Sequence, residues 1–302
     1  MKKQVSLSSK KIRDMILYGC LILLPVTQFL IFYVGVNAKS LLFVFQRYEN
    51  DRYVFNGLNN FVELGNMLKD EFVLMSFKNS LIVLVISIVV SIPLGLFFSN
   101  YIYKKCIGST AFKLILFLPS IIPAAIMTLL FRSVTDSIFP AIANLSDSTT
   151  DFIGLIGDTR YAFPTLIVYS IFTGFGTNIL MYVGAMSSIP ESVVEAAELD
   201  GCNSFQEFIH ITIPYIWPTL ATFLVVTIGA VFNNQFNVYT FYGKEADLSV
   251  YTMGHYLFYH MSTAQMVDYP RYATFGVFLT FIVAPITLLV RWALNRFGYK
   301  AE

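Results

Sequence analysis

Six stretches of the chain are almost continuously apolar, and the charged positions fall between them. The stretches lie at approximately Met15–Val36, Asn79–Phe98, Leu114–Phe131, Phe163–Met186, Trp217–Tyr239 and Tyr272–Val290. None of them contains Asp, Glu, Lys or Arg. A helix needs about 20 apolar residues to cross the hydrocarbon core of a bilayer. The pattern therefore predicts an all-α membrane protein with six transmembrane helices. Pro93, Pro119, Pro123 and Pro285 fall inside these stretches, where lipid-embedded helices tolerate proline better than soluble helices do.

The composition agrees with a membrane protein, because 56% of the residues are apolar and only 13% are charged. A soluble domain carries charge on about a quarter of its residues. The net charge of +1 gives no reason to expect a nucleic acid as partner.

The first apolar stretch has a second interpretation as a cleaved signal peptide. Lys2, Lys3, Lys10 and Lys11 precede it, and Val36-Asn37-Ala38 is similar to a cleavage site. The apolar run of Met15–Val36 is longer than the roughly 7 to 15 residues of a signal-peptide core. We therefore expect this stretch to remain as a transmembrane helix.

The distribution of basic residues predicts the orientation, because cytosolic segments are enriched in Lys and Arg. With the N-terminus inside, the inner segments hold eleven of the 20 basic residues, although the outer segments are longer in total. We expect both termini in the cytosol. The predicted organisation is a cytosolic segment 1–14, a first helix 15–36, an extracytoplasmic loop 37–76, and a core 77–298 of five helices with a cytosolic loop 187–214.

The sequence lacks the motifs of several kinds of nucleotide-binding, metal-binding and catalytic site. No GxxxxGK[ST] loop is present to bind a nucleotide phosphate, so any ATP must be hydrolysed by another chain. Cys20, Cys106 and Cys202 form no CxxC pair, and His255 and His260 are five residues apart, on different helix faces. We predict no catalytic residue, no metal site and no cofactor on this chain. Paired carboxylates occur only in loops, which disfavours a membrane enzyme. No ionisable residue lies in the spans, which disfavours an ion-coupled secondary transporter.

The cytosolic loop predicts an acidic helix–turn–helix. Pro190 suits the first turn of a helix and Glu191 its positive end, and Gly201 allows a turn with positive φ. The expected apolar side of this first helix consists of Val193, Val194, Ala197 and Leu199. A second short helix is expected from about Ser204 to Pro214, with Phe205, Phe208, Ile209 and Ile211 as its apolar residues.

The charge of this loop is unusual for the cytosolic side, because no Lys or Arg occurs between Arg160 and Lys244. An acidic helix pair favours a protein partner with a complementary groove. A separate ATPase would also explain the missing nucleotide site.

The same loop carries a resemblance to a known family. Glu195-Ala196-Ala197 is followed after three residues by Gly201 and after nine more by Ile211-x-Ile213-Pro214. This spacing resembles the EAA motif of binding-protein-dependent ABC importer permeases, with Ile213 in place of the usual Leu. Asp200 before Gly201 is similar to the carbohydrate branch of that family.

Further stretches resemble the first permease of maltose-type sugar systems, so that about residues 12–298 are covered. They are Phe55–Phe61, Phe117–Pro119 through Phe131-Arg132, and Phe232–Asn234. One departure is Phe241–Glu245, where the family usually has a Gly-rich segment that contacts the binding protein.

The resemblance implies a type I ABC importer permease fold in the bacterial plasma membrane. It implies four kinds of partner: a second homologous permease, an ATPase dimer that holds ATP and Mg²⁺, an extracellular solute-binding protein, and a sugar-like solute. The loop helices would seat in a cleft of the ATPase. The implied coupling residues are Glu195, Ala196, Ala197, Asp200, Gly201, Ile211, Ile213 and Pro214.

Two uncharged polar stripes predict a path for the solute. Span four offers Ser170, Thr173, Gly174, Thr177 and Asn178, whose offsets of 0, 3, 4, 7 and 8 fall on one helical face. Span five offers Thr227, Ala230, Asn234 and Asn237, with Asn233 alongside. Small and polar residues also mediate helix packing in membranes, so packing against the sister permease remains an equal alternative.

Within the stripes, Asn234 matches a solute-contacting position of the family's sugar permeases, and Tyr182, Phe232 and Tyr239 are aromatic neighbours suited to stacking on sugar rings. The absence of charge favours a neutral solute, with a glycerophosphodiester, a peptide or an amino acid as alternatives.

Overall fold

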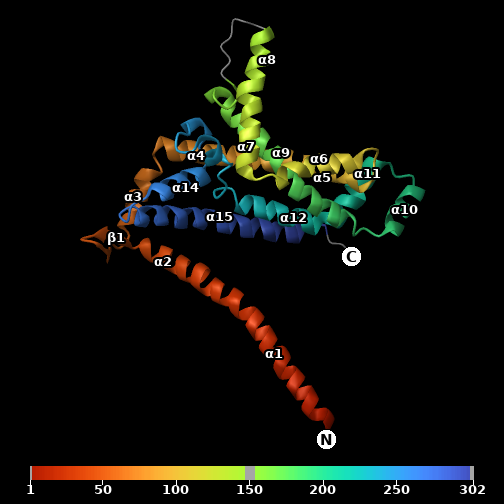
Figure 1. Ribbon diagram of the computed structural model, residues 1–302, viewed down its shortest axis with the longest axis horizontal. Coiled ribbons are helices and arrows are strands. Elements are labelled where there is room, and N and C mark those ends of the chain that lie inside the picture. Colours follow the sequence, from red (N-terminus) through yellow and green to blue (C-terminus); the bar gives the residue numbers. More distant parts are fainter. Residues whose placement is uncertain (1, 147–153, 300–302) are drawn as a thin grey trace. The chain divides into compact units, whose positions relative to one another are not determined.

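The computed structural model describes residues 2–146 and 154–299 and is mostly helical (Figure 1). Within these residues, six helices are long and apolar enough to cross a membrane: Lys11–Phe43, Glu71–Tyr103, Ala124–Ile142, Thr159–Met186, Ser204–Gly229 and Tyr269–Phe297. The prediction of a helical membrane protein with six spans is confirmed. The described chain divides into two compact units, Met1–Asn66 with Ala264–Phe278, and Met67–Thr263 with Leu279–Glu302.

The first unit begins with one long helix and continues into a β-hairpin. Its elements are α1 (Lys2–Gln28), the π-helical η1 (Phe29–Gly35), α2 (Val36–Phe43), β1 (Gln46–Glu49), β2 (Arg52–Phe55) and α3 (Asn59–Met67). The strands are antiparallel, and Glu49 pairs with Arg52 across the turn. Asn50 and Asp51 have φ of 50° and 57°, which is the geometry of a two-residue hairpin turn whose twist matches the strands.

Side-chain hydrogen bonds hold this hairpin within its unit. Asn60 is buried, and its Nδ2 donates to the carbonyl oxygens of Val44 and Gln46, each at 2.8 Å. The hydroxyl of Tyr53 donates to the carbonyl oxygen of Met266 at 3.1 Å. The predicted extracytoplasmic loop is therefore an ordered hairpin followed by a helix.

The second unit contains spans two to five and the C-terminal part of span six. Its elements are α4 (Glu71–Ile86), η2 (Ser87–Ser91), α5 (Ile92–Tyr103), α6 (Ser109–Ile121), α7 (Ala124–Ser133), η3 (Val134–Ile138), α8 (Phe139–Ser146), α9 (Thr159–Met186), α10 (Glu191–Leu199), α11 (Ser204–Glu207), η4 (Phe208–Thr212), α12 (Ile213–Gly229), α13 (Val238–Tyr242), η5 (Leu248–Val250) and α14 (Met253–Thr263), and it includes the C-terminal part of α15 (Tyr269–Phe297).

The central element of this unit is α9, against which α5, α6 and α12 pack (Figure 1). Tyr182 and Met186 of α9 are buried with Leu96 of α5, Phe208 of η4 and Ile216 of α12 in one apolar cluster. This cluster fixes the end of α9 from which the α10–α11 hairpin emerges.

The third predicted span, Leu114–Phe131, is not one helix. It breaks between α6 and α7 at Ile122 and Pro123, which have ψ of 133° and 134°. Proline has no N–H to donate, and its ring disfavours helical geometry in the preceding residue. The spanning helix begins after the break, at Ala124, and α6 is too short to cross.

Candidate functional site

The first helix of the predicted cytosolic loop, α10, has the predicted start. Pro190 is its N-cap residue in an extended conformation, and Glu191 lies in its first turn. Ala197 is buried, and Val193 and Val194 are half-buried. Leu199 was expected on the same apolar side, and this is wrong, because its side chain is 89% exposed. Two residues after Ala197 correspond to a rotation of about 200° around the helix, so Leu199 projects from the opposite face.

The turn after α10 is closed by backbone hydrogen bonds that hold Gly201 in the left-handed conformation. The N–H of Gly201 donates to the carbonyl oxygen of Glu198 at 3.1 Å, and the N–H of Cys202 donates to that of Ala197 at 3.0 Å. These two bonds define a Schellman motif, whose left-handed position is occupied by Gly201 with φ of +78°. The predicted turn at Gly201 is therefore present.

The second helix of the loop starts as predicted but does not end at Pro214. Asn203 and Gln206 form a reciprocal capping box at the start of α11. The chain then continues through the π-helical η4 into α12 without a break, and Pro214 lies in the first turn of α12. Proline is tolerated there because the shift from π to α hydrogen bonding already leaves backbone donors without an α-helical partner. The second half of the loop and span five thus form one continuous helix, Ser204–Gly229.

An ion pair that the sequence did not reveal ties this hairpin to the end of span two. Lys104, which caps the C-terminus of α5, places its Nζ 2.5 Å and 2.6 Å from the two carboxylate oxygens of Glu207 in α11. The Glu207 side chain is 4% exposed and that of Lys104 is 24% exposed. Because 103 residues separate the two, no local pattern could have paired them.

The motif residues lie on both sides of the hairpin. Glu195, Ala196, Asp200 and Gly201 are exposed, whereas Ala197 is buried and Ile211, Ile213 and Pro214 are half-buried. Leu199 and Phe205 add exposed apolar side chains, 89% and 64% exposed, beside the acidic ones. The hairpin, which we call the α10–α11 hairpin, therefore presents an acidic surface with two exposed apolar side chains, while Ala197, Ile211 and Ile213 pack inward.

A pocket of ≈ 310 Å³ lies among α4, η2, α9 and α12. Of the predicted path residues, Ser170, Gly174, Asn178 and Asn234 line it, together with Thr227 and Ala230. We call it the uncharged pocket, because its lining contains no Asp, Glu, Lys or Arg. Tyr182 also lines it, whereas Phe232 is buried and the ring of Tyr239 packs against Phe258.

The other predicted path residues do not gather in this pocket. Thr173 and Asn237 line a second pocket of ≈ 420 Å³, beside the break at Pro123. Thr177 and Asn233 are exposed. The structure therefore brings together only part of each stripe.

The stripe of span five is divided because α12 ends at Gly229 and not at Tyr239 as predicted. Residues 230–237 form turns, and Phe236 and Asn237 have φ of 54° and 55°. Within these turns Asn234 accepts a hydrogen bond from the backbone N–H of Phe236 through Oδ1, at 2.9 Å. This local bond competes with the helix and explains part of the early end.

The turn beneath Asn234 is supported by Thr252 and by the first turn of α14, which it precedes. The hydroxyl of Thr252 donates to the carbonyl oxygen of Asn234 at 3.1 Å. A Cβ on Gly254 would lie 2.5 Å from the same oxygen, so the close approach requires glycine. His255 is fully buried beside this contact, and burial together with His260 lowers its pKa to about 4. The histidine is therefore neutral at physiological pH.

Two hydroxyls of the uncharged pocket have no partner among the described residues. Ser170 Oγ and the Tyr182 hydroxyl are both buried and make no hydrogen bond there. Buried polar groups normally have partners, so these two are suited to bind a polar guest. The sequence also did not single out Ser80, Ser87 and Ser91, which line the same pocket from span two. Their spacing of seven and four residues is the signal that could have found them.

Comparison with known proteins gives a family and a fold. Residues 91–300 match the family described as "Binding-protein-dependent transport system inner membrane component". The probable ABC transporter permease protein YurN of Bacillus subtilis (strain 168) is 28% identical over 291 residues, which cover 93% of this chain and 94% of that protein. The lactose transport system permease protein LacF of Rhizobium radiobacter is 26% identical over 253 residues, which cover 80% of this chain and 82% of that protein.

A solved structure supports the same fold. A chain in the crystal structure of a bacterial ABC transporter that imports the acidic polysaccharide alginate superposes with a TM-score of 0.80. The match covers 97% of this chain and 99% of that chain at 21% identity. At this identity the likeness describes the fold.

Proposed function

Because this chain belongs to the family of binding-protein-dependent transport system inner membrane components, we propose that it carries a sugar or oligosaccharide. Membership of this family means that the chain is a non-catalytic, multi-pass permease subunit of an ABC importer in the cell membrane.

The observation that supports a neutral, hydroxyl-rich solute is the uncharged pocket. Its buried hydroxyls of Ser170 and Tyr182 lack partners among the described residues, and its lining holds no charge. A charged solute would leave its own charge unpaired against this wall, at a large desolvation cost. A relative whose name assigns it to lactose transport supports the same solute class.

The proposed partners are a second homologous permease, an ATPase dimer that holds ATP and Mg²⁺, and an extracellular solute-binding protein. The α10–α11 hairpin seats in the ATPase through exposed Glu195 and Leu199. Because the chain from Ser204 to Gly229 is one continuous helix, a displacement of the hairpin moves span five and the wall of the uncharged pocket with it. Transport is then a switch between two rigid arrangements, biased by nucleotide on one side and by loaded binding protein on the other.

A reconstituted transporter tests this proposal. Proteoliposomes that contain this permease with the sister permease, ATPase and binding protein encoded beside it are supplied with labelled oligosaccharides, sn-glycerol 3-phosphate, a peptide and an amino acid. We expect uptake of a sugar. Ser170→Ala and Tyr182→Phe should each lower the maximal uptake rate by about twofold to tenfold, the worth of one lost hydrogen bond.

Ser99→Ala is the matched control, because Ser99 is buried in the same unit and already donates to the carbonyl oxygen of Gly95 at 2.7 Å. It should leave the uptake rate unchanged. Uptake of only a phosphate ester, peptide or amino acid would exclude the sugar. Equal effects of Ser99→Ala and Ser170→Ala would remove the pocket hydroxyls from the path.

A further inference from the structure

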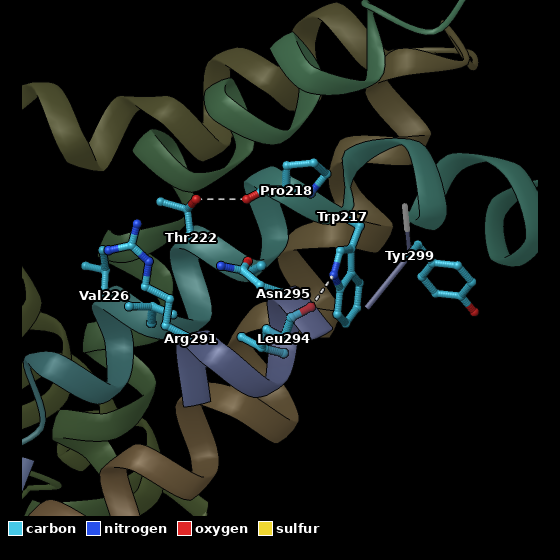
Figure 2. A pocket seen from close by; sticks show the side chains of 10 residues that line it. Trp217, Pro218, Thr222, Val226, Arg291, Leu294, Asn295 and Tyr299 are labelled. Carbon is cyan, nitrogen blue, oxygen red and sulfur yellow. Dashed lines mark hydrogen bonds between the residues drawn. The ribbon is translucent and has the colours of Figure 1, made fainter. Parts of the chain in front are cut away.

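A third cavity lies between α12 and the last turns of α15 (Figure 2). Its volume is ≈ 460 Å³. We call it the α12–α15 niche. Its lining residues are Trp217, Pro218, Ala221, Thr222, Val225, Val226, Arg291, Leu294, Asn295 and Tyr299.

The end of the niche near the C-terminus is built by close packing. Trp217 donates its indole N–H to the carbonyl oxygen of Leu294 at 3.3 Å, and its ring meets that of Tyr299 edge-on at 5.6 Å (Figure 2). A Cβ on Gly298 would overlap the Trp217 ring and the Leu294 carbonyl, so only glycine fits there. The niche is thus a formed cavity with a fixed aromatic wall.

Its lining divides into an apolar part and a polar part. Ala221, Val225 and Leu294 supply the apolar surface. Arg291 and Asn295 extend from α15 towards the α12 side chains (Figure 2). Among the described residues no carboxylate pairs with Arg291, because the four ion pairs found there involve other side chains. Arg291 and Asn295 are both exposed, so their polar groups can reach an anionic ligand whose apolar part covers the neighbouring apolar surface.

The position of the niche across the membrane follows from where the apolar stretches of spans five and six begin and end. Trp217 begins the apolar stretch of span five, and Arg291 directly follows that of span six. Both ends lie on the side predicted to be cytosolic. Trp and Tyr concentrate at headgroup level, and basic pockets between helices on the cytoplasmic side bind lipid headgroups.

We propose that the α12–α15 niche binds one anionic phospholipid of the cytoplasmic leaflet. The lipid phosphate accepts hydrogen bonds from the Arg291 guanidinium and the Asn295 amide, and an acyl chain lies on Ala221 and Val225. A free phosphate would leave the apolar part of the niche without a role. The lipid would lie beside α12, whose residue Val226 also lines the uncharged pocket.

The test uses the complete transporter and phosphatidylglycerol as the probe. The complex is placed in nanodiscs of phosphatidylcholine, and retained phosphatidylglycerol is counted by native mass spectrometry during titration. Arg291→Gln should weaken its binding about fivefold, the worth of one basic group at a membrane surface. Arg296→Gln is the matched control: it removes the same charge five residues later, from a residue that is also exposed but lies outside the niche lining. It should leave the affinity unchanged.

Val225→Phe provides an independent test, because the larger side chain fills the apolar part of the niche and leaves all charges in place. It should also reduce the binding of phosphatidylglycerol. Equal weakening by Arg291→Gln and Arg296→Gln would show general surface attraction and overturn the proposal. So would a chemical cross-link between this niche and an acidic segment of a partner chain in the lipid-loaded complex.

Discussion

Lys104→Met is expected to destabilise the α10–α11 hairpin by about 3 kcal/mol and to abolish ATP-driven uptake, because removing one partner of a buried ion pair leaves an uncompensated charge. The Glu207 carboxylate is 4% exposed, and Lys104 is the only cation found to pair with it among the described residues. This loss of about 3 kcal/mol is at the lower end of what breaking a buried ion pair costs, because the Lys104 side chain retains some access to solvent. The measurements are thermal unfolding of the purified complex and uptake into proteoliposomes.

The double variant Lys104→Met with Glu207→Leu is the matched control. Apolar residues of similar size often replace a buried ion pair at little cost. The double variant should therefore recover most of the stability that Lys104→Met loses. Equal destabilisation by the single and the double variant would show that the two residues are not energetically coupled.

Gly201→Val is expected to open the turn of the hairpin and to reduce uptake strongly. Gly201 has φ of +78°, and an L-residue pays about 1–2 kcal/mol for that left-handed conformation, with a β-branched residue at the upper end. An added Cβ would meet nothing within 4 Å, so the cost comes from the backbone and not from a clash. Retention of the ATPase on the purified permease and uptake are the two measurements.

Gly201→Asn distinguishes an effect of backbone conformation from an effect of the added side chain. Asn is the residue other than glycine that most readily occupies this position of a helix end. It should therefore keep most of the uptake that Gly201→Val loses. If asparagine and valine were equally damaging, the surface at Gly201, and not its φ, would be the cause.

The sequence predicted the spans and the hairpin well because both depend on local signals. Apolar length identified the six helices, and the Pro190, Glu191 and Gly201 pattern identified α10 and its turn. The hairpin of β1 and β2 was missed, although Asn50-Asp51 between two alternating segments is a hairpin signal. The break at Pro123 was missed because proline within an apolar stretch was taken as tolerated.

The features that escaped prediction depend on contacts between distant segments. The Lys104–Glu207 pair joins residues 103 apart. The end of α12 at Gly229 did have a local signal, because Asn233, Asn234, Gln235 and Asn237 interrupt the apolar run, but the asparagines were interpreted as part of a solute-lining stripe. The end also depends on the Asn234 side chain and on the contact of Thr252, just before α14, with the turn. The uncharged pocket collects residues from three spans, so helical periodicity within one span gave only part of it.

The central claim is that the α10–α11 hairpin transmits the work of a separate ATPase, and Glu195→Lys tests it most directly. Glu195 is exposed on α10, so the reversal of charge alters the docking surface and not the packing of the hairpin. The control is Glu63→Lys, which makes the same reversal at an exposed residue of the predicted outer loop. One measurement decides: the rate of ATP-driven uptake by each reconstituted complex. We expect Glu195→Lys to reduce uptake at least about tenfold, the effect of losing 1.4 kcal/mol of binding, while Glu63→Lys transports as the unaltered protein does. Full-rate uptake by the Glu195→Lys complex would contradict the account.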